Sequence, residues 1–158
     1  MNGILVVWVG RRGPAGLEGL ADTYAKRVAR HVPFSEVRVR PATGRQGDAR
    51  RALSEEAAAV RRHLRPADVV VALDERGREN TTEEFAAWLA DWLPRGRTVF
   101  IIGSDLGLDL SLKNEASRTL ALSRLTLPHG LARVLLLEQL FRACDLLAGG
   151  QYHRGSMS

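Results

Sequence analysis

Cysteine is almost absent from this sequence, which contains Cys144 and no other cysteine. One cysteine excludes an internal disulfide framework and a cysteine cage for a metal ion. It is typical of a protein from a reducing compartment. The histidines, at positions 31, 63, 129 and 153, show no spacing of metal ligands, and we therefore expect no metal site.

Long apolar runs are also missing. The first apolar run, residues 4–9, is too short for a signal peptide, and no basic residue precedes it. No other stretch approaches the roughly 20 apolar residues that a membrane helix needs. We therefore expect a cytoplasmic protein with no membrane partner.

Lysine is scarce, but arginine is abundant. The chain has a formal net charge of +5 and a sequence pI of about 10.3, with lysine only at positions 26 and 113. Guanidinium groups suit bidentate binding of phosphate, and a basic balance favours any polyanion. Solvated helix faces in an arginine-rich sequence explain the same composition, so charge alone does not decide between the two interpretations.

The apolar residues of the chain predict strands that alternate with helices. Continuous apolar runs predict buried strands at 4–9, 68–74 and 98–102, and we expect a half-exposed strand at 34–40 and a short one at 120–123. Helical spacing, capping residues and breakers predict helices at 17–31, 48–65, 81–93, 110–117 and 130–148. Residues 75–80 are predicted to form a loop. This alternation is typical of a single α/β domain, residues 1–158, with a mostly parallel sheet and a flexible tail at 150–158.

The predicted last helix is unusually apolar, because its leucines and valines cover more than one face. A domain of this size offers it a sheet on one side only. We therefore expect a second subunit to cover the other side, which predicts a homodimer.

A glycine loop, residues 103–107, follows a predicted buried strand. Open α/β sheets bind ligands at this position, although most glycine loops after strands are simple turns. The spacing differs from the dinucleotide-binding fingerprint. No arrangement of serine, cysteine or carboxylate suggests covalent catalysis. The residues by themselves thus predict a basic α/β homodimer with a ligand pocket at its strand ends.

The last third of the chain carries longer motifs. Residues 122–129 read Leu-Ser-Arg-Leu-Thr-Leu-Pro-His, residues 133–143 read Arg-Val-Leu-Leu-Leu-Glu-Gln-Leu-Phe-Arg-Ala, and Tyr-His-Arg follows at 152–154. Together with Leu73-Asp74 and Ile101-Ile102-Gly103, these motifs resemble the RlmH family of the SPOUT superfamily. The resemblance covers essentially the whole chain and is most specific at 122–142. It implies methylation of N3 of a pseudouridine in large-subunit (23S) ribosomal RNA.

The resemblance also implies a fold and a cofactor. SPOUT enzymes have a parallel sheet flanked by helices and a C-terminal trefoil knot, a rare exception to unknotted topology. They are homodimers that hold S-adenosylmethionine in three loops. Carried over by motif, the cofactor-binding residues are Leu73, Gly103, Leu122, Ser123, Arg124, Leu125, Thr126 and Leu127.

On the substrate side, the resemblance indicates His129, Arg142, Tyr152, His153 and Arg154 as catalytic residues. Arginine can stabilise a developing imide anion, histidine can accept its proton, and tyrosine can stack on the base. The glycines before the tail are expected to let it reach the partner's cofactor pocket. If the tail is not needed, the substrate contacts would pass to Arg133 and the Arg11–Arg12 loop.

The sequence departs from the family pattern at three positions. Ser104 and Gln151 stand where the family usually has glycine and proline, and Asp105 adds a carboxylate that either lies near the cofactor's sulfonium or faces solvent. The alternatives are a SPOUT methyltransferase with another RNA target and a non-enzymatic RNA-binding dimer. A nucleotide-dependent oxidoreductase is disfavoured by the missing fingerprint. Because so small a chain has little surface for reading RNA sequence, we expect the assembled ribosome as its substrate partner.

Overall fold

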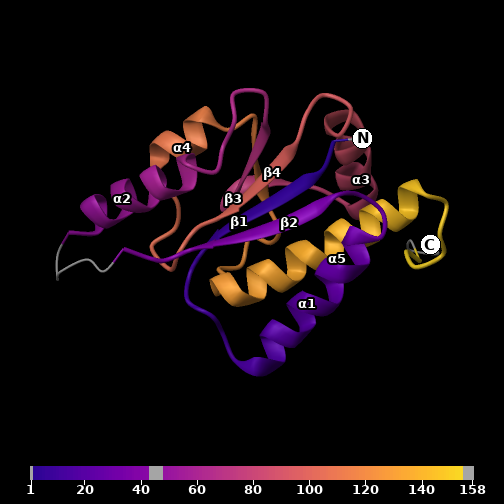
Figure 1. Cartoon of the computed structure of the whole chain (residues 1–158), viewed down its shortest axis with the longest axis horizontal. Helices are drawn as coiled ribbons and strands as arrows, with labels where there is room; N and C mark the ends of the chain where they lie inside the picture. Colours follow the sequence, from indigo (N-terminus) through magenta and orange to yellow (C-terminus); the bar gives the residue numbers. More distant parts are fainter. Residues whose placement is uncertain (1, 43–47, 155–158) are drawn as a thin grey trace.

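The structure is a computed structural model that describes residues 2–42 and 48–154. Its centre is a five-stranded sheet with the order β2-β1-β4-β3-β5, in which every neighbouring pair is parallel (Figure 1). The strands are β1 (Ile4–Val9), β2 (Phe34–Val39), β3 (Val69–Glu79), β4 (Thr98–Ile102) and β5 (Arg118–Ala121). The α/β class and the parallel sheet predicted from the sequence are therefore confirmed.

Helices cover both faces of the sheet. They are α1 (Ala15–Ala29), α2 (Ala49–Arg61), α3 (Thr82–Trp92), α4 (Leu110–Glu115) and α5 (His129–Leu147). One apolar cluster joins the sheet to α1, α3 and α5, and a second joins the opposite face to α2 and α4. The predicted capping box of α3 is present, since Thr81 and Glu84 each bond the other's backbone N–H.

The central strands are buried along their whole length. Every residue of β1 and of β4 is buried, and Val6, Phe100 and Ile101 are completely inaccessible. Strands covered by helices on both faces are expected to be continuously apolar, and this is why the sequence locates β1 and β4 so well.

Strand β3 is longer than predicted, because residues 75–79 form strand rather than loop. Leu73 and Arg78 both align with Leu120 of β5, so the strand bulges between them and then resumes pairing. Gly77 fits this bulge because a Cβ there would lie 2.8 Å from the backbone of Thr119. The polar residues of this stretch resemble a loop in sequence, yet the ladder with β5 supplies their backbone partners.

Three other predicted boundaries need correction. Helix α2 ends at Arg61 rather than at 65, because the chain turns through residues 62–64 ahead of Pro66. Helix α4 ends at Glu115, since the next residue is extended. Strand β5 occupies 118–121 rather than 120–123, because its approach to β3 begins with the bond from Ser117 N to Val70 O.

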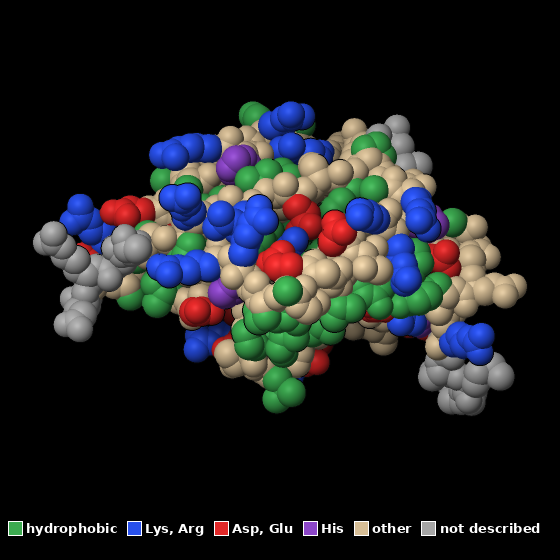
Figure 2. Space-filling view, turned by 60° about the horizontal axis from the view of Figure 1, so that its bottom comes forward, with side chains coloured by type: hydrophobic (Ala, Val, Ile, Leu, Met, Phe, Trp, Pro, Cys, Tyr) green, Lys and Arg blue, Asp and Glu red, His purple; other side chains and the backbone are tan. Residues whose placement is uncertain are grey.

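Helix α5 is the long apolar helix predicted for 130–148, shifted by one residue. It packs on α1 and α3 and buries one face, whereas Leu131, Leu135 and Leu147 remain 41–46% exposed. Figure 2, which turns the lower side of Figure 1 forward, shows a band of hydrophobic side chains on this side of the molecule. Among the described helices, none is long and apolar enough to cross a membrane.

Candidate functional site

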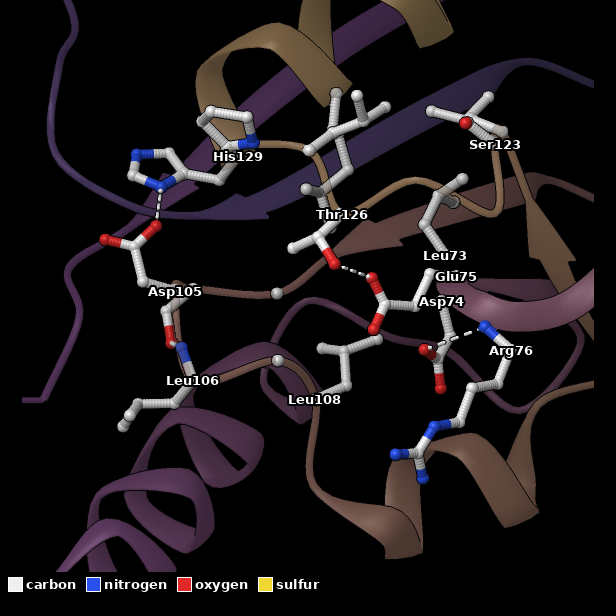
Figure 3. Close-up of a pocket in the computed structure, with 18 of the residues that line it drawn as sticks. Leu73, Asp74, Glu75, Arg76, Asp105, Leu106, Leu108, Ser123, Thr126 and His129 are labelled. Carbon is white, nitrogen blue, oxygen red and sulfur yellow. Dashed lines mark hydrogen bonds and ion pairs between the residues drawn. The ribbon is translucent and has the colours of Figure 1, made fainter.

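A pocket of about 650 Å³ opens at the carboxyl end of β4, beside the bulge of β3 (Figure 3). Its walls are the bulged stretch of β3 and the segments that follow β4 and β5, and the last two agree with the place where open α/β sheets bind ligands. The lining residues are Leu73, Asp74, Glu75, Arg76, Ile102, Gly103, Ser104, Asp105, Leu106, Gly107, Leu108, Lys113, Leu122, Ser123, Leu125, Thr126, Leu127, Pro128, His129 and Ala132.

The loop after β4 forms one wall and is closed on itself. Gly107 N donates to Ser104 O at 2.8 Å, and Gly107 has a φ of 85°, which favours glycine. A Cβ on Gly103 would collide with the carbonyl oxygen of Gly107, so this glycine permits the tight turn. The Ser104 hydroxyl donates to Oε1 of Glu56 on α2 at 2.8 Å. Ser104 therefore anchors the loop to α2.

The segment between β5 and α5 forms the opposite wall. Ser123 Oγ accepts from Leu125 N at 3.0 Å, and the Thr126 hydroxyl donates to Glu75 at 2.6 Å across the pocket floor (Figure 3). Of the residues predicted in this segment, Arg124 lies outside the pocket wall. Its side chain is 83% exposed and pairs with Glu79 at 3.0 Å.

His129 closes the pocket at the first turn of α5. Its Nδ1 lies 2.9 Å from Asp105 Oδ1 (Figure 3). Its ring stacks on Trp8. A Cβ on Gly10 would lie 2.6 Å from Nε2, so this nitrogen faces the β1–α1 loop. Asp105 remains 81% exposed at the rim. Asp105, for which the sequence allowed either a place near the cofactor or one in solvent, thus lies at the rim and orients His129.

An ion pair forms the floor beside β3. Lys113 Nζ donates to Asp74 at 2.9 Å, and the N–H of Arg76 donates to the other carboxylate oxygen. Burial raises the pKa of Asp74, but these hydrogen bonds outweigh burial and hold the pKa below its ordinary value. Asp74 is therefore a carboxylate at neutral pH.

A second polar cluster lies near the other end of α5. Glu138 accepts from Arg142 Nε at 2.9 Å, from the Tyr152 hydroxyl at 3.1 Å and from Gln139 at 2.7 Å. Burial and hydrogen bonds with Tyr24 and Glu138 raise the pKa of Tyr152 to about 12. Glu138 and Arg142 thus form an ion pair one helical turn apart, and Glu138 also binds the tail through Tyr152.

The other tail residues flank this cluster. His153 Nε2 lies 2.8 Å from Glu83 on α3, and Arg154 is exposed. At about 1.5 Å per residue, His129 and Arg142 are about 20 Å apart along the helix. Of the five predicted catalytic residues, only His129 therefore lies at the pocket of its own chain.

Arg133 is largely enclosed, with a side chain that is 12% exposed. Its guanidinium donates to Glu36 at 2.7 Å and to Glu18 at 2.9 Å, and it stacks over Trp8. Burial lowers the pKa of Arg133, but these carboxylates outweigh burial and raise it. Arg133 therefore ties α5 to α1 and β2, and its fork is already occupied by protein partners.

Sequence reasoning missed several lining residues. Glu75 and Arg76 belong to the part of β3 that resembled a loop, and their position just after Leu73-Asp74 was the available signal. Lys113 reaches the pocket from α4, and nothing in its local sequence indicates this. Leu106 and Leu108 lie within or beside the glycine loop and could have been included with Gly103.

Two solved structures described as a methylase and a methyltransferase have a similar architecture. A probable methylase family protein from Haemophilus influenzae superposes with a TM-score of 0.56 at 15% identity, over 98% of this chain and 72% of that chain. A probable methyltransferase from Bordetella pertussis gives a TM-score of 0.55 at 16% identity, over 89% and 93%. At this level of identity the likeness shows the fold alone: an α/β protein of the methylase type.

Sequence similarity identifies the family. The family model described as "Predicted SPOUT methyltransferase" matches residues 2–153, and this chain belongs to that family. Three proteins named ribosomal RNA large subunit methyltransferase H are similar over nearly their full lengths. The protein of Thiobacillus denitrificans is 42% identical (94% of this chain, 97% of the relative), that of an Anaeromyxobacter species 44% (94% and 97%), and that of Gloeobacter violaceus 40% (96% and 99%).

Proposed function

We propose that this chain is a methyltransferase of large-subunit ribosomal RNA, specific for N3 of a pseudouridine in 23S RNA within the assembled ribosome. The observation that carries the proposal is the similarity, at 40–44% identity, to relatives named for methylating this RNA. The pocket supports it, because seven of the eight residues expected to bind the cofactor line it. Action on ribosomes would put the protein in the cytoplasm.

The pocket is suited to S-adenosylmethionine. Its volume of about 650 Å³ lies within the range of about 300–1,000 Å³ that is usual for cofactor sites. Leucines 73, 108, 122 and 127 offer an apolar wall, and the backbone of 103–107 offers hydrogen-bonding groups. Asp105 and Glu75 place carboxylates at the rim and floor, which favours a cation such as a sulfonium. Leu73, Gly103 and the 122–127 segment would hold this group.

When bound, S-adenosylmethionine supplies an activated methyl group, so the protein has mainly to position the base and receive its proton. His129 is the catalytic candidate beside this pocket. With Nδ1–H donating to Asp105, its Nε2 carries the lone pair that can accept the N3 proton. Asp105 keeps the ring in this tautomer and orientation.

The remaining catalytic candidates act from a second chain in this proposal. Arg142, Tyr152 and His153 form one cluster that lies about 20 Å from His129 along the same helix, at about 1.5 Å per residue. A homodimer that pairs the exposed side of α5 with that of a second copy would bring one chain's cluster toward the other's pocket. Arg142 and the exposed Arg154 would then stabilise the imide anion, and Tyr152 would stack on the base.

We also infer a trefoil knot at the C-terminal end. Strand β5 lies at the edge of the sheet beside β3, and α5 then returns to pack on α1, α3 and the central strands. The connecting segment 122–128 runs beside the β3 bulge and the pocket. This path and the membership of the SPOUT family support a threaded connection.

The test uses ribosomes from a bacterial strain that lacks the modification. The purified protein and methyl-labelled S-adenosylmethionine are incubated with ribosomes, with free 23S RNA and with small subunits, and the product is mapped by mass spectrometry. We expect one methylated pseudouridine, on the ribosome only. Binding of S-adenosylmethionine, but not of NAD, is expected in calorimetry. Binding of ribosomes without methyl transfer would contradict the proposal and favour a non-enzymatic RNA-binding dimer.

A further inference from the structure

The loops after β1 and β2 carry three exposed arginines at the pocket edge of the sheet. Arg11 and Arg12 follow β1, and Arg40 follows β2. Since β1, β2 and β4 are parallel, these loops leave the same edge of the sheet as the loop after β4 (Figure 1), and the pocket opens at that edge. We propose that Arg11, Arg12 and Arg40 form a phosphate-binding surface that docks ribosomal RNA beside the pocket. The proposal deepens the proposed function and rests on it.

The two loops are held together and against the pocket. Gly10 N donates to Val39 O at 3.0 Å, and Arg38 donates to Gly10 O at 3.2 Å. Gly10 also packs against the imidazole of His129, which lines the pocket. Arg11 and Arg12 therefore follow directly after Gly10, a residue that contacts the pocket wall. His129 Nε2, the proposed proton acceptor, faces the same loop.

Two carboxylates near the β1–α1 loop have hydrogen-bond partners of their own. Glu18 accepts from Gly13 N at 3.0 Å and from Arg133 at 2.9 Å, and Glu36 accepts from Arg133. Arg133 thus satisfies both carboxylates from within the protein. Within residues 2–42 and 48–154, neither Arg11 nor Arg12 forms an ion pair or hydrogen bond through its side chain, so both guanidiniums are available to an outside anion.

Arginine suits this partner. Its planar guanidinium binds two phosphate oxygens at once. Phosphate contacts of this kind fix the position and orientation of a protein on a nucleic acid without reading its sequence. Ribosomal RNA is therefore the partner that this charge and position fit. Anchors of protein interfaces are typically large side chains such as tryptophan, tyrosine and arginine in well-packed pockets, whereas residues 11–14, Arg-Arg-Gly-Pro, form an exposed loop with no aromatic side chain.

The experiment compares three triple variants of the full-length protein. The first is R11Q/R12Q/R40Q. The second, R11K/R12K/R40K, keeps the charge but removes the fork. The control, R30Q/R62Q/R65Q, removes the same charge from exposed arginines at the opposite edge of the sheet, near the ends of α1 and α2 and the start of β3. Each variant is measured for ribosome affinity as a function of salt, for KM and kcat of methylation, and for S-adenosylmethionine affinity.

We expect R11Q/R12Q/R40Q to raise the ribosome Kd and KM by about 10-fold or more and to lower the salt slope of log Kd by about 2 to 3. Its kcat and S-adenosylmethionine affinity should stay near wild type. The lysine variant should keep most of the salt slope. An unchanged salt slope, or an equal loss in the control, would overturn this inference while leaving the proposed function intact. A wild-type protein that fails to methylate ribosomes would overturn both.

Discussion

A hydrogen bond between Ser104 and Glu56 connects the glycine loop, residues 103–107, to helix α2. Glu56 is 4% exposed, and its two carboxylate oxygens accept from Ser104 Oγ at 2.8 Å and from Ala42 N at 2.9 Å. A buried carboxylate is costly unless such donors satisfy it. A serine at this position can donate a hydrogen bond to Glu56, which a glycine, having no hydroxyl, cannot.

We predict that Ser104→Ala lowers the free energy of unfolding by about 1–3 kcal/mol, because it leaves one oxygen of the buried Glu56 carboxylate without its donor. S-adenosylmethionine affinity should fall as well, since the loop loses its anchor. Urea unfolding and calorimetry measure the two effects. Ser117→Ala, at an exposed serine, is the matched control and should change stability by less than about 0.5 kcal/mol. Equal stability of the two variants would contradict this role for Ser104.

The ion pair between Asp68 and Arg97 makes the stability of the fold depend on pH in the acid range. The carboxylate of Asp68 accepts from Arg97 Nε and Nη2 at 3.0 and 2.8 Å and from Arg65 N at 2.7 Å, and the Asp68 side chain is 2% exposed. Burial raises the pKa of Asp68, but these hydrogen bonds outweigh burial and lower the pKa. A carboxyl group whose pKa is lowered in the folded state stabilises the fold at pH values above its unfolded-state pKa. This stabilisation is lost as the pH falls through the folded-state pKa.

We therefore predict that Asp68→Asn is less stable than wild type at pH 7 and that the difference narrows between about pH 5 and pH 2. Thermal unfolding at several pH values measures this. Asp22→Asn removes a carboxylate from an exposed pair with Lys26, and should have little effect at any pH because surface pairs contribute little. A constant difference between Asp68→Asn and wild type over this range would contradict the prediction.

How far sequence could predict the site depends on where each residue lies relative to a strand. The family motifs located Leu73, Gly103 and Leu122. Gly103 and Leu122 directly follow β4 and β5, where parallel sheets bind ligands, whereas Leu73 lies within β3 just before its bulge. Lys113 could not be predicted, since its ion pair with Asp74 depends on how α4 packs. The outward direction of Arg124 was equally unpredictable, because no periodicity applies to an irregular loop.

At the scale of elements, burial explains which boundaries could be predicted. Strand β4 was located to the residue because helices cover both its faces and leave a continuous apolar run. The second half of β3 was missed because four of the five residues at 75–79 are charged and exposed. They form strand only because β5 lies beside them, and pairing with a distant segment leaves no local pattern.

The tail after α5 is a second element whose place depends on tertiary contacts. The ring of Tyr152 packs against that of Phe141 in a tilted arrangement with centroids 4.6 Å apart, and the backbone N–H of Tyr152 donates to Asp145 at 3.0 Å. Arg142 also lies over the Tyr152 ring. We predicted a flexible tail for residues 150–158. Residues 155–158 lie outside the described part of the chain.

We predict that removing residues 151–158 lowers the methylation rate by about 100-fold or more, because a positioned acid–base or anion-stabilising group contributes about 100- to 10,000-fold. Folding and cofactor binding should survive with a modest loss of stability, since Tyr152 covers Phe141. Tyr152→Phe, which keeps the ring but loses the hydroxyl, separates stacking from hydrogen bonding to Glu138. Wild-type methylation by the truncated protein would move the substrate contacts away from the tail.

At the scale of the whole molecule, the exposed leucines lie mainly on one side. Leu20 of α1 and Leu131, Leu135 and Leu147 of α5 are each 41–48% exposed. They belong to the same helical layer, which packs on one face of the sheet. A contiguous apolar surface of this kind marks an interface, and the proposed homodimer would cover it.

We predict that Leu135→Arg separates the dimer into folded monomers. In a monomer the new arginine reaches water, whereas in the interface it would be an unpaired buried charge that costs about 3–5 kcal/mol. Sedimentation equilibrium at micromolar concentration measures the assembly, and circular dichroism measures folding. Leu110→Arg, at a 66% exposed leucine of α4 on the opposite face, should remain dimeric. A monomeric wild type would contradict the proposed assembly.

If each site combines the pocket of one chain with the tail of the other, two different inactive variants should restore activity when they form a mixed dimer. Gly103→Ala blocks the pocket, because its Cβ collides with the carbonyl oxygen of Gly107, but leaves the tail intact. The truncated protein lacks the tail but keeps its pocket. If the two are unfolded and refolded together, random pairing under two-fold symmetry gives one complete site in half of the dimers, about a quarter of wild-type activity. Methylation of ribosomes by each variant alone and by the mixture measures this. If pocket and tail act within one chain, the mixture will remain as inactive as its components.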